Sequence, residues 1–343
     1  MLAQRIKSAS KKRRMSNLKD LIQEFSQKKI LVVGDLMLDH YIFGKVDRIS
    51  PEAPIPVVVV EGENYKLGGA GNVAMNVASL GGLPFIIGTI GSDDNANILI
   101  NQLRKNRLPT DLIIHSVDKP TTIKTRVFAN SQQVVRIDKE ETSKLATATL
   151  QSVLQNFSKI IKQVDAVIFE DYNKGFFSKF LIKRLINIAK EEAKPILVDP
   201  KSDNFLDFVG CTVFKPNKKE FARGTHLKST KHTDEKGFEL LEQLGAKHIV
   251  LTKSEEGLSI FSKGEKEPVH LPTFTKKVYD VSGAGDTVIA TLALAYCCGA
   301  SIKDASQIAN YAAAIACSSV GVKPVSLQKL KKELEKIKEI GTK

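Results

Sequence analysis

Residues 280–287 read Asp280-Val281-Ser282-Gly283-Ala284-Gly285-Asp286-Thr287, and they lead directly into the apolar segment 288–296. This order predicts a glycine-containing loop that opens a buried helix, because glycine lets the backbone turn sharply and leaves amide N–H groups uncovered. The dipole and the unpaired first-turn donors of such a helix favour an anion at its N-terminus. A carboxylate in that turn can accept a proton from a hydroxyl as a phosphate group arrives. On these residues alone, the alternative is that Ser282, Asp286 and Thr287 only cap the helix.

The chain before this loop has the pattern of an α/β protein. Residues 30–35 begin with a continuous apolar run, which is typical of a strand buried on both faces of a parallel sheet. From residue 84 onward, short strands and helices alternate, which predicts a mostly parallel sheet with helices on both faces. The predicted strands are 85–88, 165–169, 196–198, 212–214, 249–252 and 259–261, and the predicted helices are 95–103, 179–193, 235–244, 288–298 and 305–317.

Polar residues stand at the ends of several predicted strands. The strand ends are Gly34-Asp35 with Asp39 four residues later, Glu170-Asp171, Asp199-Pro200-Lys201, Lys215-Pro216-Asn217 and Thr252-Lys253. Any one of these residues could serve a turn or a cap. Because parallel strands end at one edge of a sheet, we expect the whole set to gather in a single crevice, where open α/β sheets bind ligands.

Two excursions from this pattern, near residues 41–62 and 120–138, are rich in alternating and β-branched residues. Prolines 51, 54 and 56 confine the first excursion to an edge strand or a loop. We expect the two to form a small accessory sheet that covers the site as a lid. Between them, residues 67–78 begin with a glycine cluster that opens a helix. This cluster does not follow a strand of a βαβ unit, and the chain has no G-x-x-x-x-G-K-[ST] loop, which disfavours the common dinucleotide and P-loop sites.

Composition narrows the class of protein. The 343 residues are 42% hydrophobic and 26% charged, as in soluble globular proteins. No apolar run approaches the ~20 residues of a membrane span, and no secretory signal is present. Four cysteines without metal-ligand spacing indicate reduced thiols and a cytoplasmic protein.

The net charge of +13 lies largely in local runs, and neither a zinc-finger spacing nor an aromatic RNA-binding motif accompanies it, so we expect no nucleic-acid and no membrane partner. A basic balance also suits small-molecule substrates that carry phosphates. The expected organisation is a basic N-terminal extension with a short helix at 1–28, one domain at 29–330 and a basic tail at 331–343.

Three motifs, at residues 34–57, 68–74 and 280–286, carry a family resemblance. The sequence resembles the ribokinase-like (pfkB-type) family of sugar kinases over essentially all of residues 30–325. Within that family it is most similar to the D-glycero-D-manno-heptose 7-phosphate kinases. The resemblance implies an α/β three-layer sandwich with a mostly parallel central sheet and a small β-sheet lid. It also implies ATP and Mg²⁺ as cofactors, a sugar phosphate as substrate, and a homodimer formed through the lid.

The resemblance implies roles for individual residues. Asp286 is implied as the catalytic base, with the backbone amides of Gly283, Ala284 and Gly285 as an anion hole for the transferring phosphoryl group. The residues implied at the nucleotide are Asn217, Lys218, Lys219, Glu220, Thr252, Lys253, Gly257 and Asn310, and Glu220 is also implied to hold magnesium through water. The residues implied near the sugar are Asp35, Asp39, Gly69, Asn72 and Asp171, and we expect Arg136 and Lys174, with Arg48 as a further candidate, to hold the phosphate that the substrate already carries.

The chain departs from its relatives at two strand ends: Glu170 stands in place of a small residue, and Phe214-Lys215 in place of a Leu-Thr pair. Many relatives continue into a cytidylyltransferase-like domain, so a chain that ends at Lys343 is expected to act as a kinase only. Two alternatives stay open from the sequence. One is another sugar or sugar-phosphate kinase of the same family, and the other is a non-catalytic binding protein that keeps the fold.

Overall fold

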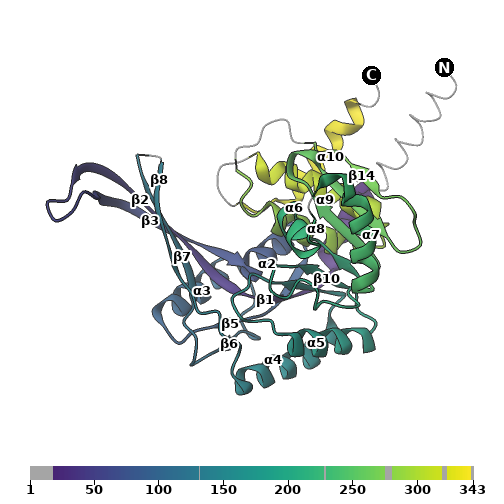
Figure 1. The fold of residues 1–343 in the computed structure, drawn as a ribbon, viewed down its shortest axis with the longest axis horizontal. Coiled ribbons are helices and arrows are strands. Elements are labelled where there is room, and N and C mark those ends of the chain that lie inside the picture. The colour runs from purple at the N-terminus through teal and green to yellow at the C-terminus, as the bar shows by residue number, and fades with distance from the viewer. Residues whose placement is uncertain (1–17, 131, 228, 275–279, 319–322, 341–343) are drawn as a thin grey trace.

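The computed structural model describes residues 18–130, 132–227, 229–274, 280–318 and 323–340. Its centre is an eight-stranded sheet with the order β14-β13-β12-β11-β10-β9-β1-β4 (Figure 1). The strands are β1 (Lys29–Gly34), β4 (Leu83–Ile87), β9 (Ala166–Glu170), β10 (Ile196–Asp199), β11 (Val213–Phe214), β12 (His248–Thr252), β13 (Leu258–Ser262) and β14 (Val269–Leu271). All neighbours from β4 to β12 are parallel, and only β13 and β14 pair antiparallel, which confirms the mostly parallel sheet.

Helices cover both faces of this sheet. In β1, Ile30 and Val32 pack into one buried cluster while Leu31 and Val33 pack into the other, because alternate strand residues point to opposite faces. The first cluster draws on α2 (Ala70–Ser79), α3 (Asp94–Lys105), α8 (Ala284–Cys297), α9 (Ile302–Cys317) and α10 (Leu327–Ile340). The second draws on α4 (Thr147–Ile160), α5 (Lys179–Glu191), α6 (Lys218–Gly224) and α7 (Thr233–Leu244). The fold is therefore the expected three-layer α/β sandwich, and the sequence pattern did not predict the helices α4, α6 and α10.

A second sheet of four strands, in the order β3-β2-β7-β8, extends away from the body (Figure 1). Its strands are β2 (Leu36–Ile49), β3 (Pro56–Gly69), β7 (Thr122–Ala129) and β8 (Gln132–Lys139), so the two excursions do form one accessory sheet, the lid. The proline-flanked strand β3 lies at an edge, as predicted. A separate two-stranded sheet joins β5 (Thr89–Ile90) to β6 (Ile114–His115).

Body and lid meet at Asp35. This residue is the single link between β1 and β2, and its carbonyl accepts a hydrogen bond from the N–H of Ala70, where β3 passes into α2 (3.0 Å). Gly69 has φ +55°, and a side chain there would place its Cβ 2.3 Å from the Asp35 carbonyl oxygen. Only glycine fits this crossing, which fixes where the lid leaves the body.

The ends of the described chain pack on the body. Leu18, Ile22 and Phe25 are fully buried, so the short helix expected before residue 29 belongs to the core, whereas residues 1–17 of the expected basic extension lie outside the described residues. The expected boundary at residue 330 falls inside α10, whose Leu330 and Leu334 are fully buried. Among the described residues, none of the helices is both long enough and apolar enough to cross a membrane.

Candidate active site

The glycine loop of residues 280–287 ends at the N-terminus of α8, as predicted. Gly283 is the N-cap residue with φ +75°, and Asp286 lies in the first helical turn with only 5% of its surface exposed. Two side chains hold its carboxylate. Asn72 donates through Nδ2 to Oδ2 at 2.5 Å, and the hydroxyl of Tyr172 donates to Oδ1 at 3.1 Å. Burial raises the pKa of Asp286 to about 6, which suits a general base.

The helices α2 and α8 are fixed against each other next to this carboxylate. The Thr287 hydroxyl donates to Asn76 Oδ1 at 2.9 Å, and Asn76 in turn donates through Nδ2 to the carbonyl of Asn72 at 2.9 Å. These bonds are buried, so they hold Asn72 in position to reach Asp286. The glycine motif at residues 68–74 and the glycine loop at residues 280–286, which are more than 200 residues apart in the chain, thus form one site.

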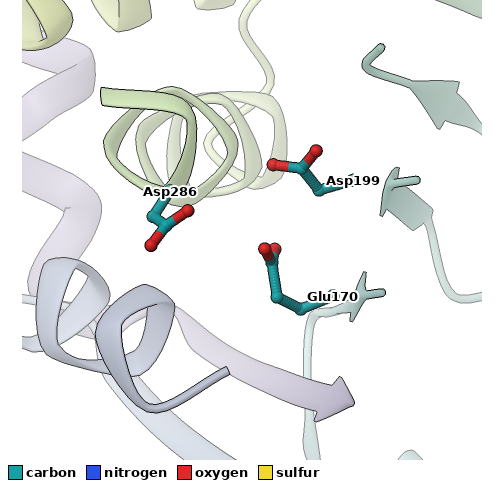
Figure 2. A group of neighbouring side chains, drawn as sticks. All are labelled: Glu170, Asp199 and Asp286. Atoms are coloured by element: carbon teal, nitrogen blue, oxygen red, sulfur yellow. The ribbon is translucent and has the colours of Figure 1, made fainter. Parts of the chain in front are cut away.

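Three carboxylates converge beside the glycine loop (Figure 2). Glu170 ends β9, Asp199 ends β10, and one oxygen from each of these residues and from Asp286 lies within 4.8 Å of the others. Burial raises the pKa of Glu170 well above its usual range, and the neighbouring Asp199 and Asp286 add to the effect. Lys215 Nζ pairs with Asp199 Oδ2 at 2.8 Å, and a Cβ on Gly285 would lie 3.5 Å from that ammonium group. The strand ends therefore bring a buried cation as well as carboxylates next to the loop.

Asn217 and Glu220, two of the residues expected at the nucleotide, lie at the start of α6. Asn217 Oδ1 accepts the N–H groups of Lys219 and Glu220, both at 2.9 Å, and Glu220 Oε2 accepts the N–H of Asn217 at 2.8 Å. This reciprocal arrangement is a capping box. The other oxygen of Glu220 accepts Lys201 Nζ at 2.6 Å. Lys201 also lies over the ring of Tyr172, 4.8 Å from its centroid, which links the start of α6 to the Asp286 site.

The loop of residues 252–257, which includes three residues expected at the nucleotide, lies beside α6. Asn217 forms a parallel bridge with Thr252, and Lys218 pairs with Glu256 in the short turn that follows β12. Within that turn the N–H of Lys253 donates to the carbonyl of Gly257 at 2.8 Å. Asn310 is further along the chain in α9, and its side chain donates to the carbonyl of Pro272 at 2.8 Å. The structure thus brings the 217–220 and 252–257 segments together and gives Asn310 a backbone partner near β14.

The loop that follows β9 is anchored by Asp35. The carboxylate of this buried residue accepts the N–H groups of Tyr172 (2.7 Å), Lys174 (3.2 Å) and Phe176 (3.2 Å). Burial raises the pKa of Asp35, and the backbone donors oppose that rise. Asp35 therefore shapes this loop, whether or not it also contacts a sugar.

Asp171 begins the same loop and is also committed to internal partners. Its carboxylate accepts the N–H of Asn173 at 2.8 Å and the side chain of Asn204 at 3.0 Å. Asn173 has φ +55°, a conformation that asparagine tolerates better than most residues. Burial, followed by the charge of Asp35, raises the pKa of Asp171 to about 6.

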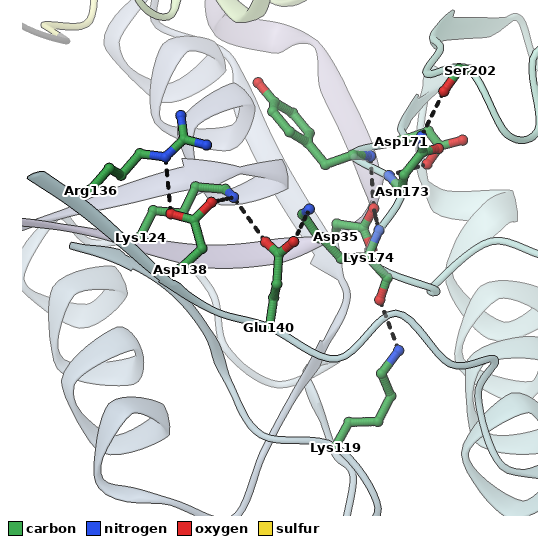
Figure 3. A network of polar contacts seen from close by, with 11 residues as sticks. Asp35, Lys119, Lys124, Arg136, Asp138, Glu140, Asp171, Asn173, Lys174 and Ser202 are labelled. Carbon is green, nitrogen blue, oxygen red and sulfur yellow. Dashed lines mark hydrogen bonds and ion pairs between the residues drawn. The ribbon is translucent and has the colours of Figure 1, made fainter. Parts of the chain in front are cut away.

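Basic and acidic side chains of the lid meet this loop (Figure 3). Lys174 Nζ pairs with Glu140 Oε1 at 2.8 Å, and Lys124 Nζ bridges Glu140 Oε2 (2.9 Å) and Asp138 Oδ2 (3.1 Å). Arg136 Nε lies 3.1 Å from Asp138 Oδ1. Lys174 and Arg136, which were expected to hold a phosphate, are therefore each paired with a carboxylate of one connected network. Arg48, the further candidate, is exposed near the end of β2.

The other expected sugar residue of the lid, Asp39, pairs with Arg126 Nη1 at 2.5 Å. Asp39 also lies against Gly68, where a Cβ would come 3.1 Å from Oδ2. The absence of a side chain at Gly68, in the motif at residues 68–74, thus leaves room for the Asp39 carboxylate.

Comparison with known proteins identifies the family of this chain. A family model described as "pfkB family carbohydrate kinase" matches residues 27–329. The chain belongs to the pfkB family of carbohydrate kinases.

This pfkB kinase is 40% identical over 316 residues to the bifunctional protein HldE of a Nitratiruptor species. The aligned region covers 92% of this chain and 66% of that protein. HldE of Vibrio cholerae serotype O1 is 40% identical over 310 residues, covering 90% of this chain and 64% of the relative. The kinase thus spans just under two thirds of the length of these curated relatives.

Solved structures with low sequence identity share the fold of the pfkB kinase. Arabidopsis thaliana ribokinase, solved with ribose and ATP, superposes with a TM-score of 0.72 at 17% identity, covering 90% of this chain and 99% of that one. Phosphofructokinase-2 of Escherichia coli gives a TM-score of 0.74 at 17% identity, covering 92% and 99%. These structures confirm the ribokinase-like fold.

Several side chains of the site were not assigned a role from the sequence. Tyr172 reaches Asp286, while Lys201 pairs with Glu220 and Lys215 pairs with Asp199. The signal for the two lysines was present, because both follow strand ends that we expected to share a crevice. Lys124 and Arg126 lie within the predicted lid strand, where the alternating pattern gave no sign of which side chains face the site.

Proposed function

We propose that this pfkB kinase transfers the γ-phosphoryl group of ATP to the anomeric O1 of D-glycero-D-manno-heptose 7-phosphate, giving the 1,7-bisphosphate and ADP. This reaction would serve ADP-heptose synthesis for the lipopolysaccharide core in the cytoplasm. The choice of sugar rests on the motif at residues 34–57 and on the 40% identity to the HldE proteins.

One observation carries the proposed chemistry: a buried Asp286 in the first turn of α8, held by Asn72 and Tyr172. In the reaction the hydroxyl oxygen on C1 attacks the γ-phosphorus, Asp286 takes the hydroxyl proton, and the bond to the β-phosphate oxygen breaks to release ADP. The backbone amides of Gly283, Ala284 and Gly285, at the helix N-terminus, would hold the transferring group. Transfer of this kind needs positioning and charge neutralisation more than covalent chemistry.

The remaining contacts follow from the same proposal. ATP would lie against the segments 217–220 and 252–257 and reach Asn310, while Asp39, Gly69 and Asn72 would hold sugar hydroxyls. Lys174 and Arg136 would bind the 7-phosphate after exchanging their carboxylate partners for it. Arginine and lysine are well suited to a phosphate group at the edge of a site that a lid can close.

Magnesium would reach Glu220 through water. Each oxygen of Glu220 accepts one hydrogen bond in the structure, which leaves lone pairs for the water of a hydrated cation. The oxygen chemistry of this carboxylate fits a hard cation, which when bound would neutralise the charge of the nucleotide phosphates.

We also propose that the kinase pairs through its lid. Large apolar side chains are exposed there, among them Phe43 (46%), Ile49 (61%) and Val60 (57%), which favours contact with a second copy. Sedimentation of the purified chain would show a dimer, and a Phe43→Asp, Val60→Asp variant would sediment as a monomer. A wild-type monomer at micromolar concentration would contradict this pairing.

An ADP-release assay with magnesium and a panel of free and phosphorylated sugars tests the function. We expect D-glycero-D-manno-heptose 7-phosphate to give the highest kcat/KM. Turnover of ribose or fructose at a matching kcat/KM would contradict the heptose assignment and favour another pfkB sugar kinase. No turnover of any sugar would favour a binding protein that keeps the fold.

A further inference from the structure

In the carboxylate cluster beside the glycine loop, the proposed reaction uses Asp286 but neither Asp199 nor Glu170, and within the described part of the chain only Asp199 has an ion-pair partner. The side chain of Glu170 is completely buried and points between Asp199 and Asp286 (Figure 2). Among the described residues, no hydrogen-bond partner reaches either Oε1 or Oε2 of Glu170. Buried carboxylate oxygens are almost always paired, so this group calls for a ligand.

The charges around Glu170 do not balance. Glu170, Asp199 and Asp286 carry three negative charges when ionised, and Lys215, which pairs with Asp199, returns one positive charge. The nearby Glu220 and Lys201 cancel each other in their own ion pair. With all three carboxylates ionised, the net charge of this group is −2, the charge that one divalent cation neutralises.

The donors also suit a hard cation. All three side chains offer oxygen, the donor type that magnesium, manganese and calcium prefer. Their nearest oxygens lie within 4.8 Å of one another. Opposite oxygens around one magnesium ion are about 4.2 Å apart, so small side-chain movements bring this set to a common ion.

We propose that Glu170 and Asp199 bind a divalent cation of the magnesium type, with Asp286 on its third side, at a site that forms without nucleotide. This site differs from the water-mediated one at Glu220, whose oxygens are held by Lys201 and by the N–H of Asn217. Glu170, at the end of β9, provides the unpaired carboxylate of this site. The inference does not depend on the identity of the sugar.

Manganese binding to the full chain tests the site. The protein is freed of metal with a chelator, dialysed, and titrated with Mn²⁺ in the absence of nucleotide, while electron paramagnetic resonance reports free Mn²⁺. We expect one Mn²⁺ per chain, displaced by excess Mg²⁺. Glu170→Gln, which keeps the shape of the side chain, is expected to weaken Mn²⁺ binding at least about tenfold. Replacing a residue that only hydrogen-bonds to a metal ligand already weakens metal binding by about ten- to a hundredfold, so loss of a ligand itself should do no less.

Matched variants separate this site from others. Glu220→Gln removes the carboxylate of the nucleotide-linked site and is expected to keep nucleotide-free binding, as is Glu61→Gln in the lid. Wild-type protein that binds no Mn²⁺ without nucleotide, or Glu170→Gln that binds it like wild type, would overturn the proposal. So would a loss that follows Glu220→Gln instead.

Thermal melting provides a second readout that a purely structural role would not move. Mn²⁺ should raise the melting temperature of the wild type, because it binds the folded state, and should leave that of Glu170→Gln unchanged. If Glu170→Gln does not fold, Glu170→Ser takes its place, because serine is smaller and carries no charge. An equal rise in wild type and variant would also overturn the site.

Discussion

The substitution Glu140→Gln tests how the lid network relates to substrate binding. Glu140 forms ion pairs with Lys174 (2.8 Å), which is proposed to bind the substrate phosphate, and with Lys124 (2.9 Å). If the phosphate replaces Glu140 as the partner of Lys174, this carboxylate competes with the substrate. Its removal should then tighten binding of the sugar phosphate.

The size of the effect follows from the exposure of these pairs. The side chains of Lys174 and Glu140 are 15% and 27% exposed, and that of Lys124 is 14% exposed. Partly exposed ion pairs of this type contribute about 0.5–1 kcal/mol each, so giving up both costs the substrate about 1–2 kcal/mol. Since about 1.4 kcal/mol is a tenfold change, Glu140→Gln should lower KM for the sugar phosphate roughly five- to thirtyfold. The kcat should not change, because uniform binding is affected and the chemical step is not.

Steady-state ADP release at low ionic strength measures this change, since added salt screens surface ion pairs. Glu61→Gln is the matched control, because Glu61 also pairs with a lid lysine, Lys45, at an exposed position outside the network. The control should leave both constants unchanged. An unchanged or higher KM in Glu140→Gln would refute the competition and indicate that Glu140 itself contacts the sugar.

Four further predictions concern the same site. Lys174→Ala should raise KM for the sugar phosphate at least about tenfold with little effect on KM for ATP, because a charge-assisted bond to phosphate is lost; an unchanged KM would place the phosphate elsewhere. Asp35→Asn should lower the free energy of unfolding by about 2–4 kcal/mol in urea titrations, since three backbone N–H groups lose a charged acceptor, and a loss below about 1 kcal/mol would contradict the anchoring role. Burial raises the pKa of Asp286 to about 6, so kcat/KM should fall as the pH drops through that value, and a pH–rate profile that stays flat to about pH 5 would contradict the base. In cation-free buffer the folded state binds the Asp286 proton more tightly than the unfolded state does. The contribution of this protonation to the free energy of unfolding is therefore complete below about pH 4 and disappears as the pH rises through 6. Asp286→Asn should flatten that part of the curve of unfolding free energy against pH.

The sequence predicted the sheet and the gathering of polar strand ends because both follow from local patterns. Apolar runs such as residues 30–34 specify buried parallel strands, and parallel strands end at one edge, so Glu170, Asp199 and Lys215 were expected close together, and their side chains do lie next to one another. The lid was equally visible, since its alternating segments and prolines differ from the surrounding α/β pattern.

The pairing of side chains within the site was not predictable, because it depends on packing between distant segments. The bond from Asn72 to Asp286 joins residues 214 positions apart, and Tyr172 reaches the same carboxylate only through the loop that Asp35 anchors. Asn217 and Glu220 matched a nucleotide motif, yet their first contacts form a capping box, which sequence spacing alone allows equally well. The unpaired oxygens of Glu170 depend on which neighbours pack around them, which no local pattern specifies.

The central claim is that Asp286 is the base of a phosphoryl transfer to a sugar phosphate. Its most direct test is Asp286→Asn, assayed with ATP, magnesium and D-glycero-D-manno-heptose 7-phosphate, with ATP affinity measured in parallel. We predict that kcat falls at least about a hundredfold while the Kd for ATP changes less than about threefold, because the base acts on the reaction and not on nucleotide binding. A variant that keeps more than about a tenth of the wild-type kcat would contradict this role for Asp286.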